Sequence, residues 1–159
     1  MRISGYQKRF GVGLACLGIG AAVLFLLWGL DRALGHVEIA GNPKPVRIAG
    51  FAVVALWLCW QFWCMKTIRR WWNHGQLCTT GPYRFVRHPI YAGGIFPASA
   101  GLALILNSWI LFLLPGFLYP VFSFLVRKEE ILMTRVFGEE YTLYAARTGK
   151  LFPRILPKK

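Results

Sequence analysis

The chain has 159 residues, of which 56% are hydrophobic and 16% aromatic, and it carries a formal net charge of +13. The length suits a single domain, but the apolar content excludes an ordinary soluble one. The positive charge does not by itself indicate nucleic-acid binding, because no recognised nucleic-acid motif accompanies it.

Four apolar runs come close to the roughly 20 residues that a helix needs to cross a bilayer. They cover residues 11–30, 46–65, 90–106 and 108–126. The sequence therefore predicts an all-α integral membrane bundle of four transmembrane helices, forming one domain over 1–159. The first run is too long for a signal-peptide core and lacks a small-residue cleavage site, so we expect it to be retained.

The third run is the shortest and carries Pro97. Only Asn107 and Ser108 separate it from the fourth run, which favours a tight helical hairpin. We expect a break at Pro97 and a second one near Pro115-Gly116, with neighbouring groups satisfying the freed backbone.

The basic residues indicate an orientation. Three precede the first run, five lie between Lys66 and Arg87, and eight follow from Arg127 onward, against Arg32, Lys44 and Arg47 on the other side. By the positive-inside rule, both termini and the loop predicted over 66–89 face the cytosol. Anionic lipid accounts for much of the net charge. If the protein is bacterial, we expect it in the cell inner membrane.

The loop over 66–89 ends in the most polar segment of the chain, directly before the third run. Arg84 and Arg87 can hold anionic oxygens, and His88 can exchange a proton near neutral pH. Pro82 and Pro89 restrict the backbone around them. This composition indicates a site at the membrane surface.

A second polar cluster lies in the C-terminal segment, which we expect to be helical and cytoplasmic over 127–159. Adjacent Glu129 and Glu130 on a continued helix would point about 100° apart, so that one faces a pocket and the other faces water. The alternative is a solvated juxtamembrane face. We expect Gly138 to end one helix, and Tyr141 and Tyr144 to cover the loop.

The four cysteines do not indicate a metal site. Cys16, Cys59, Cys64 and Cys78 form no CxxC pair and have no histidine at zinc-ligand spacing. We expect them to be buried small apolar residues.

Together these motifs resemble a known family. Gly81-Pro82-Tyr83, Arg87-His88-Pro89-Ile90-Tyr91-x-Gly93, Glu129-Glu130 and Phe137-Gly138-Glu139-Glu140-Tyr141 follow one another in the order seen in the isoprenylcysteine carboxyl methyltransferase and phospholipid methyltransferase superfamily. The resemblance covers roughly residues 75–152. It implies a small multi-pass enzyme that uses S-adenosylmethionine without a Rossmann domain.

The resemblance also implies roles for individual residues. A strand-like piece over 75–78 would contact the adenosyl group, and aromatic and polar side chains would form the rest of the cofactor wall. The implied cofactor-binding residues are Gly75, Gln76, Leu77, Cys78, Tyr83, His88, Pro89, Ile90, Tyr91 and Glu129. Carboxylates can accept hydrogen bonds from ribose hydroxyls, and aromatic faces favour a sulfonium cation.

The implied catalytic residues are Arg87, Glu130 and Arg127. The isoprenylcysteine enzymes carry a basic residue four positions before the cofactor glutamate, where this chain has Leu125, and this departure leaves other lipophilic acceptors open. A carboxylate acceptor needs no general base, whereas an amine acceptor needs one, for which Glu130 and His88 are candidates.

The predicted function is methyl transfer from S-adenosylmethionine to a lipophilic or membrane-embedded acceptor, resembling isoprenylcysteine carboxyl O-methylation. The nearest alternative is a phospholipid or small-amine N-methyltransferase. A non-catalytic scaffold or a small transporter is the alternative of another class, although the predicted spans lack the central ionisable residue that proton-coupled carriers use. We expect no metal and no nucleic-acid partner.

Overall fold

The computed structural model of the protein describes residues 11–72 and 74–154. These residues form helices joined by short loops, with no strand among them, so the all-α prediction is confirmed. The basic residues Arg2, Lys8 and Arg9, used above to predict orientation, lie outside the described residues. The chain divides into two compact units, Met1–Leu58 with Gly94–Phe122 and Cys59–Gly93 with Ser123–Lys159.

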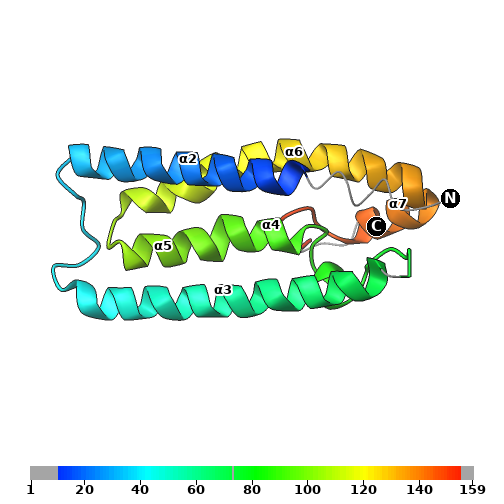
Figure 1. Ribbon diagram of the computed structural model, residues 1–159, viewed down its shortest axis with the longest axis horizontal. Coiled ribbons are helices and arrows are strands. Elements are labelled where there is room, and N and C mark those ends of the chain that lie inside the picture. The colour runs from blue at the N-terminus through cyan, green and yellow to red at the C-terminus, as the bar shows by residue number, and fades with distance from the viewer. Residues whose placement is uncertain (1–10, 73, 155–159) are drawn as a thin grey trace. The chain divides into compact units, whose positions relative to one another are not determined.

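Three long helices dominate the chain: α2 (Gly11–Ala33), α3 (Pro43–Trp72) and α6 (Leu114–Phe137) (Figure 1). Shorter elements occupy the stretch between α3 and α6, and one more helix follows α6. They are the 3-10 turns η1 (Gly81–Arg84) and η3 (Ile110–Leu113), the helices α4 (Pro89–Gly93) and α5 (Ser99–Ile105), the π-helical turn η2 (Gly94–Ala98), and α7 (Glu139–Arg147).

Within the described ranges, three helical segments are long and apolar enough to cross a membrane: Gly13–Ala33, Pro43–Trp71 and Ile110–Phe137. The chain is therefore an integral membrane protein. The predicted third span corresponds to Pro89–Ile105, an apolar helix that falls short of that length. It is also not uniform, because the break expected at Pro97 takes the form of the π-helical turn η2.

Two predicted boundaries were wrong. The loop expected over 66–89 begins later, because α3 continues to Trp72, with Arg69 and Arg70 in a last turn where cations are favourable. The fourth helix does not stop at 126, since no proline or glycine occurs between that residue and Gly138. Near Pro115-Gly116, where a second break is expected, the 3-10 turn η3 ends at Leu113 and α6 begins at Leu114, so that Pro115 lies in the first turn of α6, where its missing N–H costs nothing.

In the first unit, the beginning of α3 packs closely against α5. A Cβ at Gly50 would lie 2.7 Å from the backbone nitrogen of Ile105, and a Cβ at Gly101 would lie 2.6 Å from a methyl group of Val54. Glycine is therefore required at both positions for this approach of two backbones.

A polar cluster in the same unit ties the loop after α2 to the turn after α5. Asp31 is fully buried and accepts hydrogen bonds from Ser108 Oγ at 2.8 Å and from the backbone of Val37, while His36 Nδ1 lies 2.6 Å from its carboxylate. The side chain of Asn107, a residue with φ of 52°, bonds both the N–H and the C=O of Ala40. The predicted hairpin turn is thus held by side chains as well as backbone.

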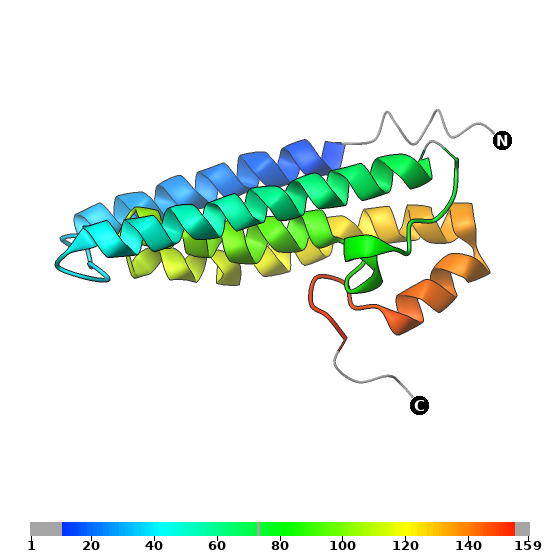
Figure 2. The same ribbon diagram turned by 90° about the horizontal axis from the view of Figure 1, so that it is seen from below.

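In the second unit, the last part of α6 carries the polar residues and then turns back into α7 (Figure 2). Gly138 separates the two helices with φ of 56° and ψ of −125°, a combination open mainly to glycine. The prediction that Gly138 ends a helix is confirmed. A buried cluster of Cys64, Cys78 and Tyr83 forms the apolar core of this unit.

Residues 75–78 are irregular, so the prediction of a strand-like piece was wrong. Leu77 and Cys78 are buried in this stretch, whereas Gln76 is exposed. The backbone of Gln76 is held by a bond to Trp71, which keeps the chain in a turn and away from an extended partner. The pairing that does form joins Val86 to Gly149 as an isolated parallel bridge.

Candidate active site

Glu129 on α6 faces the polar segment that precedes α4. The Tyr91 hydroxyl donates to Glu129 Oε1 at 2.8 Å, and His88 Nδ1 lies 3.7 Å from Oε2. The rings of His88 and Tyr91 are 6.0 Å apart, so they flank the same carboxylate. About a quarter of the Glu129 side chain, 28%, remains accessible, which leaves this carboxylate open to a further donor.

Glu130 also points toward this segment and is more fully enclosed by cations. Arg87 donates through Nε and Nη2 to Oε1 at 2.8 Å, and Lys150 Nζ lies 3.0 Å from Oε2. His88 Nε2 lies 3.6 Å from Oε1, longer than a hydrogen bond. The two arginine nitrogens share Oε1 and the lysine takes Oε2, so cations hold both oxygens of the carboxylate. Neither glutamate is the water-facing partner that the sequence suggested.

Arg87 links this acidic pair to the segment after α7. Its Nη1 donates to the backbone oxygens of Ala145 at 2.8 Å and Thr148 at 2.5 Å. The backbone N–H groups of Arg87 and His88 donate to the carbonyls of Gly149 and Lys150. The N–H groups of the guanidinium therefore donate to protein acceptors. This arrangement favours a positioning role for Arg87 over a direct catalytic one.

Tyr144 on α7 contacts the turn that contains Tyr83. Its hydroxyl donates to the backbone oxygen of Tyr83 at 2.6 Å, and Tyr141, 6.1 Å away between ring centroids, is buried beside it. Burial raises the pKa of the Tyr144 hydroxyl, which keeps it protonated as a donor. Burial likewise raises the pKa of Cys78 to about 11. The covering role predicted for the two tyrosines agrees with these contacts.

The structure thus brings together most of the residues singled out from the sequence. Pro89 is buried, and its backbone oxygen accepts a bond from Trp60, whose ring packs with Ile90 against the core around Cys78 and Tyr83. Arg127 stands apart: its side chain is exposed, one turn before the inward-facing Glu130. No contact supports the catalytic role predicted for Arg127, which stays a prediction.

Sequence reasoning missed Lys150 and Thr148 as members of the site. Lys150 also donates to the backbone oxygen of Ser123 at 3.3 Å, so it bridges the C-terminal segment to α6. One local signal was present, because Thr148-Gly149 follows α7 directly and marks a turn. Val86, which pairs with Gly149, lies 63 residues earlier in the chain, and no local pattern predicts this pairing.

A family model described as phospholipid methyltransferase matches residues 46–140, more than half of the chain. The chain belongs to this family. The match begins near the start of α3 and ends in the first turn of α7, so it includes Glu129, Glu130 and the whole segment from Gly75 to Tyr91. The superfamily predicted from the motifs is confirmed.

Two curated proteins that are named for metal resistance share sequence with the chain. It is 35% identical over 102 residues to the nickel-cobalt-cadmium resistance protein NccN of Alcaligenes xylosoxydans xylosoxydans, covering 57% of this chain and 46% of that protein. It is 31% identical over 156 residues to the cobalt-zinc-cadmium resistance protein CzcN of Cupriavidus metallidurans, covering 96% of this chain and 68% of that protein. No solved structure matches.

The residues around Glu129 fit the cofactor that such methyltransferases typically use, S-adenosylmethionine. Glu129 Oε2 has no donor nearer than His88 in the described part of the chain, so it can accept bonds from ribose hydroxyls. The backbone N–H groups of Leu77 and Cys78 have no hydrogen-bond partner among the described residues and remain available to an acceptor on the adenosyl group. Among the described residues, no group of three potential ligands suits a metal ion.

Proposed function

We propose that the chain catalyses methyl transfer from S-adenosylmethionine to a lipophilic, membrane-embedded acceptor. The observation that carries this proposal is the enclosure of Glu129 by Tyr91 and His88, with one carboxylate oxygen left for a ligand. When bound, the cofactor supplies an activated methyl group on a sulfonium sulfur. The family and the membrane-spanning helices support the same proposal.

The chain's own residues bind and orient in this proposal. Glu129 accepts the ribose hydroxyls, Tyr91 fixes the Glu129 carboxylate, and the backbone at Leu77 and Cys78 holds the adenosyl group. Of the remaining implied cofactor residues, Gly75, Gln76, Tyr83, Pro89 and Ile90 shape the wall. Because methyl transfer is an in-line displacement, holding donor and acceptor in line is the main contribution of the protein.

The acceptor decides whether a proton must move. A carboxylate acceptor is already ionised, whereas an amine must lose a proton before it attacks. His88 is better placed than Glu130 to take that proton, because Glu130 already accepts bonds from Arg87 and Lys150. Arg87 holds Glu130 and the C-terminal segment in place, and thereby positions His88.

Cofactor binding tests the proposal directly. In lipid nanodiscs, calorimetry should show saturable S-adenosylmethionine binding by the wild type. Glu129→Gln should bind at least about tenfold more weakly, since a charge-assisted hydrogen bond contributes about 1.5–3 kcal/mol. His88→Ala should also weaken binding.

The matched control is Glu140→Gln, because Glu140 is an exposed carboxylate on α7. Its affinity should equal that of the wild type. Equal binding by the wild type and all three variants would contradict the assignment of the site. Methyl transfer from radiolabelled cofactor to phosphatidylethanolamine or to a farnesylated cysteine analogue then distinguishes an amine from a carboxylate acceptor.

A further inference from the structure

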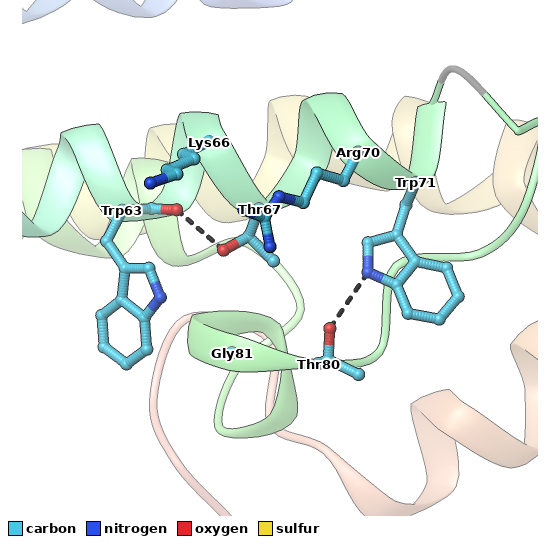
Figure 3. A pocket seen from close by; sticks show the side chains of 7 residues that line it. All are labelled: Trp63, Lys66, Thr67, Arg70, Trp71, Thr80 and Gly81. Atoms are coloured by element: carbon cyan, nitrogen blue, oxygen red, sulfur yellow. Dashed lines mark hydrogen bonds between the residues drawn. The ribbon is translucent and has the colours of Figure 1, made fainter.

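A pocket of about 360 Å³ lies between the last turns of α3 and the turn that begins η1 (Figure 3). Two tryptophans, two threonines, two cations and a glycine line it: Trp63, Lys66, Thr67, Arg70, Trp71, Thr80 and Gly81. None of these residues belongs to the cluster around Glu129 and Glu130. The pocket is therefore distinct from that cluster, although it lies in the same unit, and its volume is typical of ligand sites.

The lining is rich in hydrogen-bond donors and contains no carboxylate. Lys66 and Arg70 contribute an ammonium and a guanidinium group from successive turns of α3, and both side chains are exposed. The Trp71 indole donates to Thr80 Oγ1 at 3.0 Å, which leaves the Thr80 hydroxyl proton as a donor. A ligand that only accepts hydrogen bonds and carries negative charge, such as a phosphate, suits this lining.

Gly81 keeps the floor of the pocket open. Its φ is +58°, and a Cβ there would lie 3.2 Å from both branch atoms of Thr67 and 3.6 Å from the indole nitrogen of Trp63. A larger residue would therefore be strained and would also fill the space beside these groups. Figure 3 shows Trp63 and Trp71 projecting from α3 on either side of Thr67, above the Thr80–Gly81 turn.

The pocket also lies beside an apolar surface. It is at the end of an apolar membrane-spanning helix, where tryptophan and basic residues mark the boundary between hydrocarbon and headgroups. Phe62 and Met65, in the same turns of α3, are exposed hydrophobic side chains at 71% and 38% accessibility. A phosphate in the pocket can therefore carry acyl chains that lie along Phe62 and Met65, which a soluble phosphate cannot use.

We propose that this pocket binds the phosphate of an anionic membrane phospholipid. Lys66 and Arg70 contact the phosphate oxygens, Thr80 and the Trp63 indole donate to it, and the acyl chains follow the apolar face of α3. The bound lipid holds the Thr80–Gly81 turn against α3, directly before the segment that carries His88 and Tyr91. Lipid binding in this pocket does not require that the protein catalyses methyl transfer.

Binding of phosphatidylglycerol tests this proposal. The full-length, delipidated protein in detergent is titrated with short-chain phosphatidylglycerol, and retained lipid is counted by native mass spectrometry. Lys66→Gln/Arg70→Gln should lose at least about tenfold in affinity for the first lipid. The matched control, Arg69→Gln/Arg135→Gln, removes two exposed cations outside the pocket and should bind like the wild type. Equal losses in both variants would overturn the proposal in favour of unspecific charge attraction.

Two further titrations distinguish the source of the anion. Inorganic phosphate should compete weakly; competition as strong as that of the lipid would overturn the lipid assignment. S-adenosylmethionine affinity should be unchanged in Lys66→Gln/Arg70→Gln, whereas its loss would place the cofactor carboxylate in this pocket and overturn the proposal.

Protection of Lys66 from acetylation tests the wild type without any substitution. In nanodiscs containing phosphatidylglycerol, acetylation of Lys66 should fall by at least about fivefold relative to phosphatidylcholine alone. Lys128, an exposed lysine on α6 outside the pocket, is the internal control and should change much less. Equal protection of both lysines would count against a specific site.

Discussion

Arg87 shows how one side chain can hold three parts of a site. It reaches Glu130 on α6, Ala145 at the end of α7 and Thr148 in the following segment, and only 14% of its side chain is accessible. Lysine has the charge but not the planar fork that makes these contacts together. The arginine is therefore a geometric requirement of the fold around the acidic pair.

We predict that Arg87→Gln loosens the C-terminal segment. Loss of one partner of a partly buried ion pair should destabilise the protein by about 2 kcal/mol, between the ranges for exposed and buried pairs. Tryptic cleavage after Lys150 should become several-fold faster at a fixed temperature. Arg135→Gln, which removes an exposed cation on α6, should leave the rate unchanged. An unchanged rate in Arg87→Gln would contradict the linking role.

Cys78 gives a prediction about pH. Because burial raises the pKa of its thiol to about 11, the reactive thiolate is a minor form at pH 8 and grows about tenfold per pH unit up to that value. In a variant whose only cysteine is Cys78, maleimide labelling at pH 8 should be at least about a hundredfold slower in the folded protein than after denaturation. Comparable rates in the two states would show that Cys78 is not buried.

At the scale of elements, the junction of α6 and α7 directs the C-terminal segment back toward the site. We predict that Gly138→Ala destabilises the protein by about 1–3 kcal/mol, because its backbone conformation disfavours a Cβ although no neighbouring atom lies within 4 Å. Gly116→Ala, at an equally open position inside α6, should be neutral or stabilising by up to about 1 kcal/mol. Thermal unfolding in detergent compares the two, and equal shifts would contradict the conformational argument.

The helices and the polar partners differ in how far the sequence predicts them. Apolar runs, the break at Pro97 and the helix stop at Gly138 are local properties, so the sequence reveals them. The length of α6 was missed because a helix that leaves the membrane continues with mixed polarity. Asp31 was missed because it stands one residue beyond the predicted first span, and its partner Ser108 is 77 residues away.

The candidate site divides in the same way. The family motifs placed His88, Tyr91 and Glu129 near one another, and the structure agrees. They did not reveal that Lys150 would bind Glu130, because a lysine in a basic tail resembles any solvated cation. Long-range pairs of this kind depend on the turn at Gly138, whose direction no local pattern specifies.

At the scale of the whole molecule, one contact bears on the number of membrane crossings. Residues 86–88 bond to 149–150, so both ends of the stretch between them must emerge on one side of the membrane. The stretch therefore crosses an even number of times, and the turn at Asn107 allows Pro89–Ile105 and the long helix after it to form a returning hairpin. This argument favours four crossings although the third helix is short.

Reporter fusions test this arrangement. We predict that green fluorescent protein is fluorescent both when inserted at His74 and when fused after Arg154, because the positive-inside rule predicts that both positions face the cytosol. Alkaline phosphatase inserted after Gly41 should be active, since the same rule predicts that this loop faces the opposite side. Opposite behaviour of the His74 and Arg154 fusions would mean three crossings, and would contradict the contact between residues 86–88 and 149–150.

The contact between Arg87 and the segment after α7 also sets an order of events during biosynthesis. Thr148, Gly149 and Lys150 are translated after every other residue of the candidate site, and they satisfy Arg87, His88 and Glu130. Until these residues have been synthesised, the acidic pair lacks Lys150, and Arg87 and His88 lack the backbone oxygens that hold them. The candidate site can therefore be completed only after residues 148–150 have left the ribosome.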